Sequence, residues 1–245
     1  MIKLDIHTIE NRNIVVRIAH IHVTNEIHRN SIRGVDLPLW SKSIARAEKE
    51  SDVLLVTAEG SVFCSGGNLS DHAAQGRANG LMVNLKIGKF LDRLSTLKIP
   101  TVALVGGDVY GGGLEFLSAF DHIVGLPHCL YGFWQRRMGL SFGWGGGRRL
   151  KRRLLPARLS ALSLEARVVS AGEALRLGLI DETVPRHSAM AEALALALRV
   201  GSLPKRSVSA IKRATQVDSA AVEASEFKAL WFQEAHREAL TRFGV

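Results

Sequence analysis

The chain has 245 residues, of which 47% are hydrophobic and 22% are charged, and these proportions suit one large soluble α/β domain. No apolar run reaches the ~18 residues of a membrane-spanning helix, so we expect no membrane partner. The two cysteines, Cys64 and Cys129, fit neither a disulfide framework nor a zinc site, so we expect a cytoplasmic protein without a bound metal. Lysine and arginine outnumber aspartate and glutamate by 32 to 23, and the net charge of +9 favours a polyanionic partner such as nucleic acid, anionic lipid or a phosphate-rich small molecule.

The first half of the chain alternates strand-like and helix-like segments. Short runs of apolar and β-branched residues predict strands, and apolar residues at helical spacing predict helices. The expected strands are 1–10, 13–23, 52–60, 101–107 and 122–125, and the expected helices are 35–50, 81–97 and 114–120. The runs at 52–60 and 101–107 are nearly continuous and end in glycine, which is typical of strands buried on both faces. This alternation predicts a mainly parallel sheet with crossover helices.

After about residue 145 the pattern becomes helical. Helices are expected at 145–154, 157–166, 171–177, 187–200, 204–215 and 219–242, and only 181–185 is strand-like. We therefore divide the chain into an α/β core, residues 1–185, and a C-terminal helical region, residues 186–245. The basic stretch 148–159 predicts either a solvated helix face or a contact with a polyanion.

Two glycine-rich loops each follow a strand that is expected to be buried. Gly111, Gly112 and Gly113 open the helix that contains Glu115, and the first N–H groups of a helix have no intrahelical partner. Such a helix start binds anions, although close packing of the helix start would also require glycine. The loop 60–71 carries a second glycine pair. Because parallel strands deliver their loops to one edge of the sheet, we expect two N–H groups to converge on one oxygen atom.

Five segments resemble, in chain order, segments of the crotonase superfamily, the enoyl-CoA hydratase/isomerase family. They are HRNSI at 28–32, VFCSGGNLSD at 62–71, KIPTVALVGGDVYGGGLEFLSAFD at 98–121, MGLSFGWGGGRRL at 138–150 and VVSAGEALRLGLIDETVP at 168–185. The resemblance implies an α/β fold built as a spiral of ββα turns, with a helical C-terminal region that trimerises, and hence a homotrimer or hexamer. It also implies an acyl-CoA substrate, with coenzyme A as part of that substrate and no separate cofactor.

The resemblance assigns the chemistry to a few residues. The backbone N–H groups of Gly67 and Gly112 would form an oxyanion hole for the enolate of a CoA thioester. Glu115 falls on one of two catalytic glutamates of the hydratases, although on its own it also fits a capping residue of its helix. Gln135, four residues before Gly139, takes the place of the second glutamate. A glutamine holds water through hydrogen bonds but does not transfer a proton at neutral pH.

Further residues in these motifs are candidate substrate contacts. The expected acyl contacts are Ser65, Gly66, His72 and Trp134. The expected CoA contacts are Arg29, Lys212 and Lys228. Phe133 and Trp134 are equally compatible with the acyl pocket and with the core, and Asn68 is expected to stabilise a turn.

Three functions stay open at this point. An enoyl-CoA hydratase-like lyase, with Glu115 as acid and base, comes first. A decarboxylase of a malonyl-type CoA ester comes second, because decarboxylation creates an enolate without prior removal of a proton. An RNA-binding or non-catalytic homologue comes third; the positive charge and Gln135 favour it, whereas an aromatic content of 6% is low for stacking on bases.

Overall fold

The larger of two sheets runs through the centre of the protein. The computed structural model describes residues 2–11 and 14–242, and at residues 11, 14, 72, 73, 75 and 77 it describes the backbone alone. In spatial order the strands of this sheet are β1 (Ile2–Asn11), β2 (Ile14–Val23), β3 (Val53–Ala58), β5 (Thr101–Val105), β7 (His122–Gly125) and β10 (Glu182–Thr183). β1 and β2 are antiparallel and the remaining pairs are parallel, which confirms the predicted mainly parallel sheet.

The central strands of this sheet have no exposed face. Every residue of β5 is buried, and so are the first five residues of β3. Their near-continuous Val, Leu and Ala runs place apolar side chains on both faces, and water is excluded from both. The prediction of two fully buried strands is therefore confirmed.

A second, smaller sheet was not predicted. Its strands are β4 (Val62–Cys64), β6 (Asp108–Tyr110), β8 (Leu130–Gly132) and β9 (Val168–Ser170). Each is three residues long, too short to show a periodicity in the sequence. The expectation that 181–185 is the only strand-like segment after residue 145 is wrong, because β9 precedes it. Each of β3, β5 and β7 is followed by a short strand of the second sheet, so the chain forms the expected spiral of ββα turns.

The helices agree with the prediction in position more than in length. They are α1 (Leu37–Glu50), α2 (Leu69–Ser95), α3 (Gly112–Leu117), α4 (Gly146–Leu150), α5 (Pro156–Leu164), α6 (Ala171–Leu177), α7 (Ala189–Gly201), α8 (Arg206–Gln216), α9 (Ala220–Leu230) and α10 (Glu234–Arg242). α2 begins at Leu69 rather than at residue 81, and it contains a kink at Gly76. The single helix expected at 219–242 is two helices, separated near Phe232, whose φ of 58° is left-handed.

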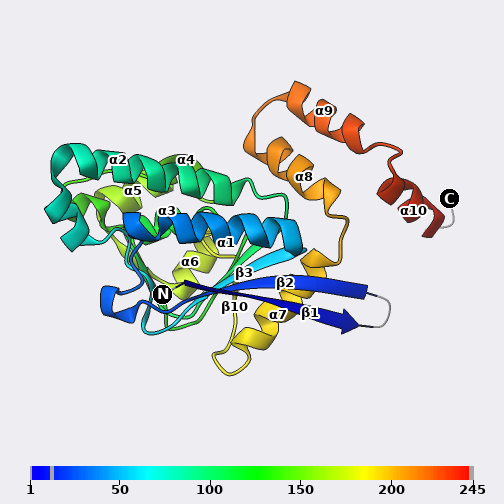
Figure 1. Cartoon of the computed structure of the whole chain (residues 1–245). Helices are drawn as coiled ribbons and strands as arrows, with labels where there is room; N and C mark the ends of the chain where they lie inside the picture. The colour runs from blue at the N-terminus through cyan, green and yellow to red at the C-terminus, as the bar shows by residue number, and fades with distance from the viewer. Residues whose placement is uncertain (1, 12–13, 243–245) are drawn as a thin grey trace.

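The helices form layers on the two sides of the larger sheet (Figure 1). α1 packs on β1, β2 and β3, and α2 packs on α1. α7 lies on the opposite side of the sheet against β2, β3 and β5. α9 packs on α8, and α9 and α10 extend away from the body of the molecule without a buried residue of their own. None of the described helices is long and apolar enough to span a membrane.

Candidate active site

The two glycine loops meet because the short strands before them are neighbours. β4 and β6 pair in parallel, with Cys64 beside Val109, so the loops that follow them leave the same edge of the smaller sheet. Gly66 has a φ of 95°, and a Cβ atom placed on it would stand 2.9 Å from the backbone nitrogen of Gly112. Ile32 adds a third segment, because its N–H donates to the carbonyl of Gly66 at 2.8 Å. The two loops therefore lie in contact, as expected from the sequence, although they meet at the edge of the smaller sheet; the convergence of their N–H groups on one oxygen atom stays a prediction.

A cavity of about 440 Å³ opens at this junction. Its lining includes Gly67, Gly112, Glu115, Gln135, Ser65, Trp134 and Arg29, which the sequence predicted for one site. Gly66 packs behind the lining, and the side chain of His72 lies outside the described residues. Among the described residues, the N–H groups of Gly67 and Gly112 donate to no protein acceptor. Two unpaired donors therefore border the same cavity, and a ligand oxygen is the kind of group that pairs with them.

Glu115 is held by the loop before α4. Its side chain is buried, with 2% of the residue exposed. Oε2 accepts hydrogen bonds from the N–H groups of Trp144 and Gly146, both at 2.8 Å, and Oε1 accepts a longer one of 3.2 Å from Gly143. The carboxylate does not cap its own helix, so the alternative of a capping residue is wrong. It is fixed in one orientation, and Oε1 keeps the greater capacity to accept a further hydrogen bond.

Arg149 supports this loop from behind and was not predicted as part of the site. Its guanidinium donates to the backbone carbonyls of Trp144 and Glu115, to the hydroxyl of Ser118 and to the carboxylate of Asp92. Burial lowers the pKa of Arg149, and the nearby charge of Asp92 opposes that effect. The basic stretch 148–159 is therefore only partly a solvated face, because Arg149 is buried.

Gln135 borders the cavity with an unused acceptor. It is 8% exposed and lies in the 3₁₀ turn Trp134–Met138. Nε2 donates to the carbonyl of Gly111 at 3.1 Å, and within the described residues Oε1 is buried without a partner. An unpaired buried acceptor has a cost in free energy, so this oxygen requires a donor from water or from a ligand.

An aromatic pair forms another part of the lining. The rings of Tyr110 and Trp134 stack with their centroids 4.0 Å apart. Arg29 lies over the tyrosine ring at 5.7 Å, and Arg137 lies over the indole at 5.0 Å. Burial and the hydrogen bond to Asp108 raise the pKa of Tyr110 to about 12, so its hydroxyl stays protonated at neutral pH.

Comparison with known proteins identifies the family of the chain. The family model described as enoyl-CoA hydratase/isomerase matches residues 16–244. The chain belongs to this family. A short-chain-enoyl-CoA hydratase of Clostridium acetobutylicum is 28% identical over 96% of this chain and 92% of its own length. An ethylmalonyl-CoA decarboxylase of Gallus gallus is 29% identical over 79% of this chain and 69% of its own length.

A solved structure of the same family shows the same fold. An enoyl-CoA hydratase from Bacillus anthracis superposes with a TM-score of 0.88 at 23% identity, over 99% of this chain and 95% of that one. The expected crotonase fold is therefore confirmed.

Some residues singled out in the sequence have structural roles in this family member. Lys212 is buried and pairs with Asp121 at 2.7 Å, so its expected contact with CoA is wrong. Phe133 is fully buried in the core rather than in the cavity lining. Asn68 begins α2 by accepting a hydrogen bond from the N–H of Asp71, as a turn-stabilising side chain does.

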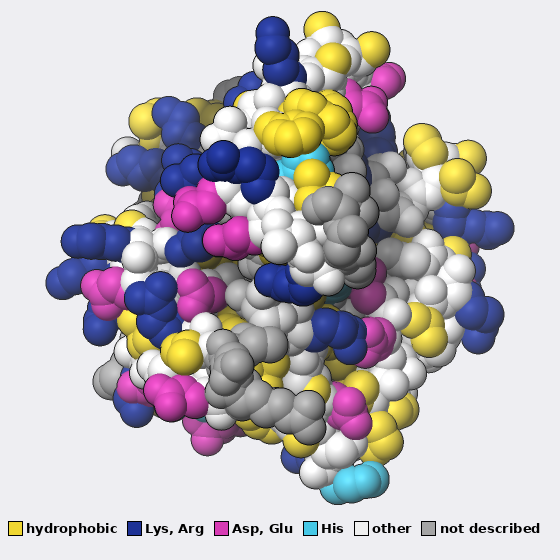
Figure 2. Space-filling model, turned by 90° about the vertical axis from the view of Figure 1, so that its right-hand side faces the viewer, with side chains coloured by type: hydrophobic (Ala, Val, Ile, Leu, Met, Phe, Trp, Pro, Cys, Tyr) yellow, Lys and Arg dark blue, Asp and Glu magenta, His cyan; other side chains and the backbone are white. Residues whose placement is uncertain are grey.

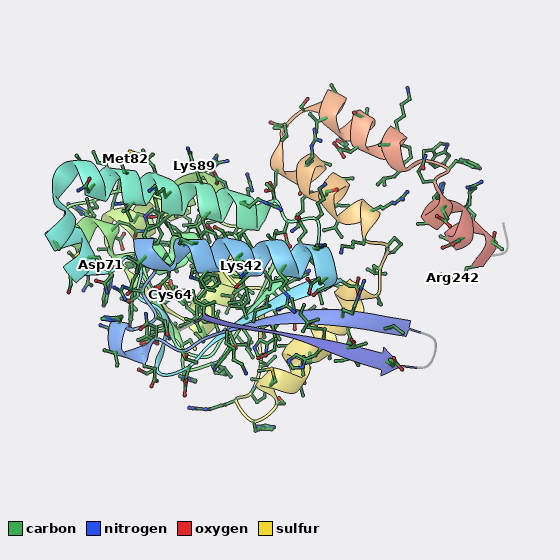
Figure 3. All side chains as sticks on the ribbon, viewed as in Figure 1. Lys42, Cys64, Asp71, Met82, Lys89 and Arg242 are labelled. Carbon is green, nitrogen blue, oxygen red and sulfur yellow. The ribbon has the colours of Figure 1, made fainter. Side chains whose placement is uncertain are left out.

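Cys64, His20 and His22 have the surroundings of structural residues rather than of reactive ones. Figure 3 shows Cys64 in the interior, and burial raises the pKa of its thiol to about 12, which makes it a poor nucleophile. His20 and His22 share the hydroxyl of Thr57, at 2.8 and 2.7 Å. Among the described residues, no group of histidine, cysteine, aspartate and glutamate has the arrangement of a metal site.

Proposed function

We propose that the protein binds an acyl-CoA in this cavity and stabilises the thioester enolate with the N–H groups of Gly67 and Gly112. The observation that carries the proposal is that these two donors, unpaired among the described residues, border one cavity with the carboxylate of Glu115. Preorganised donors aimed at a developing oxyanion supply a large part of the rate enhancement in such reactions. The names of both curated relatives state CoA thioesters as substrates.

Hydration of a 2-enoyl-CoA is the first reaction that this site supports. Water adds to Cβ, its proton passes to Glu115, and the electron pair of the double bond moves onto the thioester oxygen as the enolate. Collapse of the enolate then takes the proton from Glu115 to Cα, so one carboxylate serves as base and acid. Gln135 lines the same cavity, and its buried Oε1 would accept a hydrogen bond from the attacking water once the side chain turns toward the cavity.

The test of this role is the Glu115→Ala variant. We expect its turnover to fall by about 10²- to 10⁴-fold, because proton transfer by a positioned side chain contributes that much. The affinity for coenzyme A, measured by calorimetry, is expected to stay within a few-fold of the wild type. Unchanged turnover in a folded variant would reject the role of Glu115.

Decarboxylation of a malonyl-type CoA ester is the second candidate, and Gln135 favours it. The bond from Cα to the carboxylate breaks, carbon dioxide leaves, and the bonding electrons form the same enolate, which then takes a proton at Cα. This reaction needs no second proton-transfer group, and the residue at position 135 is not one.

Mass spectrometry of a small acyl-CoA panel separates the two reactions. Crotonyl-CoA is expected to gain one water, with ethylmalonyl-CoA and methylmalonyl-CoA unchanged. If a malonyl-type CoA ester instead loses carbon dioxide and crotonyl-CoA stays unchanged, the assigned reaction is decarboxylation and not hydration. Both reactions depend on the same oxyanion hole.

The remaining substrate contacts and the assembly belong to the same proposal. Arg29 is assigned to coenzyme A because it is exposed at the cavity and carries a positive charge. Ser65, Trp134 and His72 are assigned to the acyl side, whereas Gly66, which is not part of the cavity lining, is assigned to holding the oxyanion loop in place. The C-terminal helices α8–α10 are assigned to a homotrimer or hexamer, because α9 and α10 have no buried residue within one chain.

A further inference from the structure

Trp144 is one of the buried residues that line the candidate active site. The residue is 3% exposed and borders the cavity, whereas Ile27, His28 and Arg29 border it as exposed residues. Glu115 and Gln135 also border the cavity as buried residues, with 2% and 8% of each exposed. On the proposed function, the charged coenzyme A lies beside the exposed Arg29, and the acyl group lies among these buried residues.

The indole lies directly against the oxyanion position. Its Cζ3 and Cη2 atoms lie 2.6 and 2.7 Å from where a Cβ atom on Gly112 would stand. The ring therefore occupies the space that the absent side chain of Gly112 leaves. An acyl group whose thioester oxygen is bound to the N–H of Gly112 has this ring as a neighbour.

Contacts at several points hold the ring in place. Nε1 donates to Oδ1 of Asn84 in α2 at 2.6 Å, and Asn84 in turn donates to the carbonyl of Gly80 at 2.8 Å. The backbone N–H of Trp144 donates to Glu115 at 2.8 Å, and its carbonyl accepts from Arg149 at 2.6 Å. The two backbone bonds fix the Cα atom from which the indole projects, and turning the ring aside breaks its hydrogen bond to α2 and its packing beside Gly112, so it is a rigid wall rather than a gate.

We propose that Trp144 closes the acyl end of the cavity and restricts the enzyme to short acyl groups. The inference rests on the proposed function, which fixes the thioester oxygen at Gly112 and Cα and Cβ near Glu115. Carbons beyond Cβ then meet the indole. Ordinarily each added methylene group that is buried tightens binding, because apolar surface leaves water. A fixed indole at the end of the pocket reverses this trend, so affinity falls once the acyl chain is longer than the space in front of the ring.

The experiment measures binding rather than turnover. Saturated butyryl-, hexanoyl-, octanoyl- and decanoyl-CoA, which have no double bond to hydrate, are titrated by calorimetry into the wild type and Trp144→Ala. We expect the wild type to bind decanoyl-CoA at least about tenfold more weakly than butyryl-CoA, since one excess methylene in a closed apolar pocket costs about tenfold or more. In Trp144→Ala the dissociation constant for decanoyl-CoA is expected to be equal to or smaller than that for butyryl-CoA.

Two further variants control for loss of packing. Trp144→Phe keeps an aromatic ring but loses part of the volume of the indole and its hydrogen bond to Asn84, so the preference for short chains is expected to persist in a weaker form. Trp134→Ala removes an indole elsewhere in the lining and is expected to weaken all four ligands by a similar factor. A thermal melt of each variant verifies folding, and Trp144→Leu replaces the alanine variant if the latter does not fold.

The outcomes separate this inference from the reaction on which it rests. Equal affinity of the wild type for butyryl- and decanoyl-CoA overturns the inference, and so does an unchanged ratio in the folded alanine or leucine variant. Length-dependent binding that Trp144→Ala removes supports it. That result holds even if none of the enoyl- or malonyl-CoA panel is turned over, in which case only the proposed reaction fails.

Discussion

At the scale of single residues, the site depends on how closely two backbones approach. Gly66 lies in a region of φ that side chains rarely adopt, and it packs against the nitrogen of Gly112. The contact with Gly66, which precedes the donor Gly67 in the chain, therefore helps to position the second donor, the N–H of Gly112. A substitution that moves either loop changes both the stability and the geometry of the site.

Gly66→Ala tests this contact. Alanine at position 66 would have to adopt a left-handed φ, and its Cβ atom would lie 2.9 Å from the backbone nitrogen of Gly112. We therefore expect the free energy of unfolding to fall by about 1–3 kcal/mol. The matched control is Gly80→Ala in α2, where a Cβ atom meets nothing within 4 Å and the change is expected to stabilise by ~0.5–1 kcal/mol. Denaturant titration measures both, and equal effects would contradict the account.

The sequence predicted the residues of the site better than their contacts. Glu115 and the two glycine loops could be placed because each directly follows a recognisable run of buried residues. The hydrogen bonds that Glu115 accepts from Gly143, Trp144 and Gly146 could not be predicted. These donors lie in a loop about thirty residues later in the chain, and no sequence pattern links that loop to Glu115. Trp144 belongs to the run MG…WGG, which resembles decarboxylases of branched malonyl-CoA esters in the superfamily, but no pattern in the sequence placed its ring at the cavity.

At the scale of elements, long segments were predictable and short ones were not. The periodicity of α1 and the apolar runs of β3 and β5 extend over enough residues to be recognised. The three-residue strands β4 and β6 bring the loops together, yet they gain their structure from pairing with each other rather than from local preference. The start of α2 was missed because Gly76 and Gly80 interrupt its apolar pattern.

The division of the chain into an α/β core, residues 1–185, and a C-terminal helical region, residues 186–245, stays a prediction.

The antiparallel edge of the larger sheet carries a pH-dependent group. The pKa of His20 in β2 is lowered by burial first, and then by His22 and His7, while Asp5 opposes the shift. A histidine whose pKa is lowered in the folded state binds its proton more readily when unfolded. Its contribution to stability is therefore complete above the unfolded pKa of about 6.5 and is lost as the pH falls below it.

We expect the unfolding free energy of the wild type to decrease between pH 7.5 and pH 5.5, and His20→Gln to show a smaller decrease. The exposed His187 provides the control, since His187→Gln is expected to follow the wild type. Denaturant titration at each pH measures the difference. Parallel curves for the wild type and His20→Gln would show that His20 does not contribute.

At the scale of the whole molecule, the C-terminal helices are the part that a single chain leaves uncovered. Phe227, Trp231 and Phe232 are 61%, 51% and 56% exposed, and their rings contact one another through Trp231. Figure 2 shows hydrophobic side chains gathered on the face at this end of the molecule, beside lysine and arginine side chains. Exposed aromatic clusters of this kind are typical of surfaces that are buried in an assembly.

Sedimentation tests the proposed assembly. We expect the wild type to sediment as three chains or six, and the double variant Phe227→Asp, Trp231→Asp to sediment as one, because charges replace the apolar surface that the assembly buries. Met190→Asp in α7, a similarly exposed apolar position, is the control and is expected to keep the assembly. A wild type that sediments as a single chain at micromolar concentration would remove the proposal.

The measurement that tests the central claim most directly is a crystal structure of the protein with butyryl-CoA. The account predicts that the thioester oxygen lies about 2.7–3.1 Å from the backbone nitrogens of both Gly67 and Gly112, with Cβ beside Glu115 and the end of the acyl chain against Trp144. A thioester oxygen bound elsewhere, with either nitrogen left without it, would contradict the account.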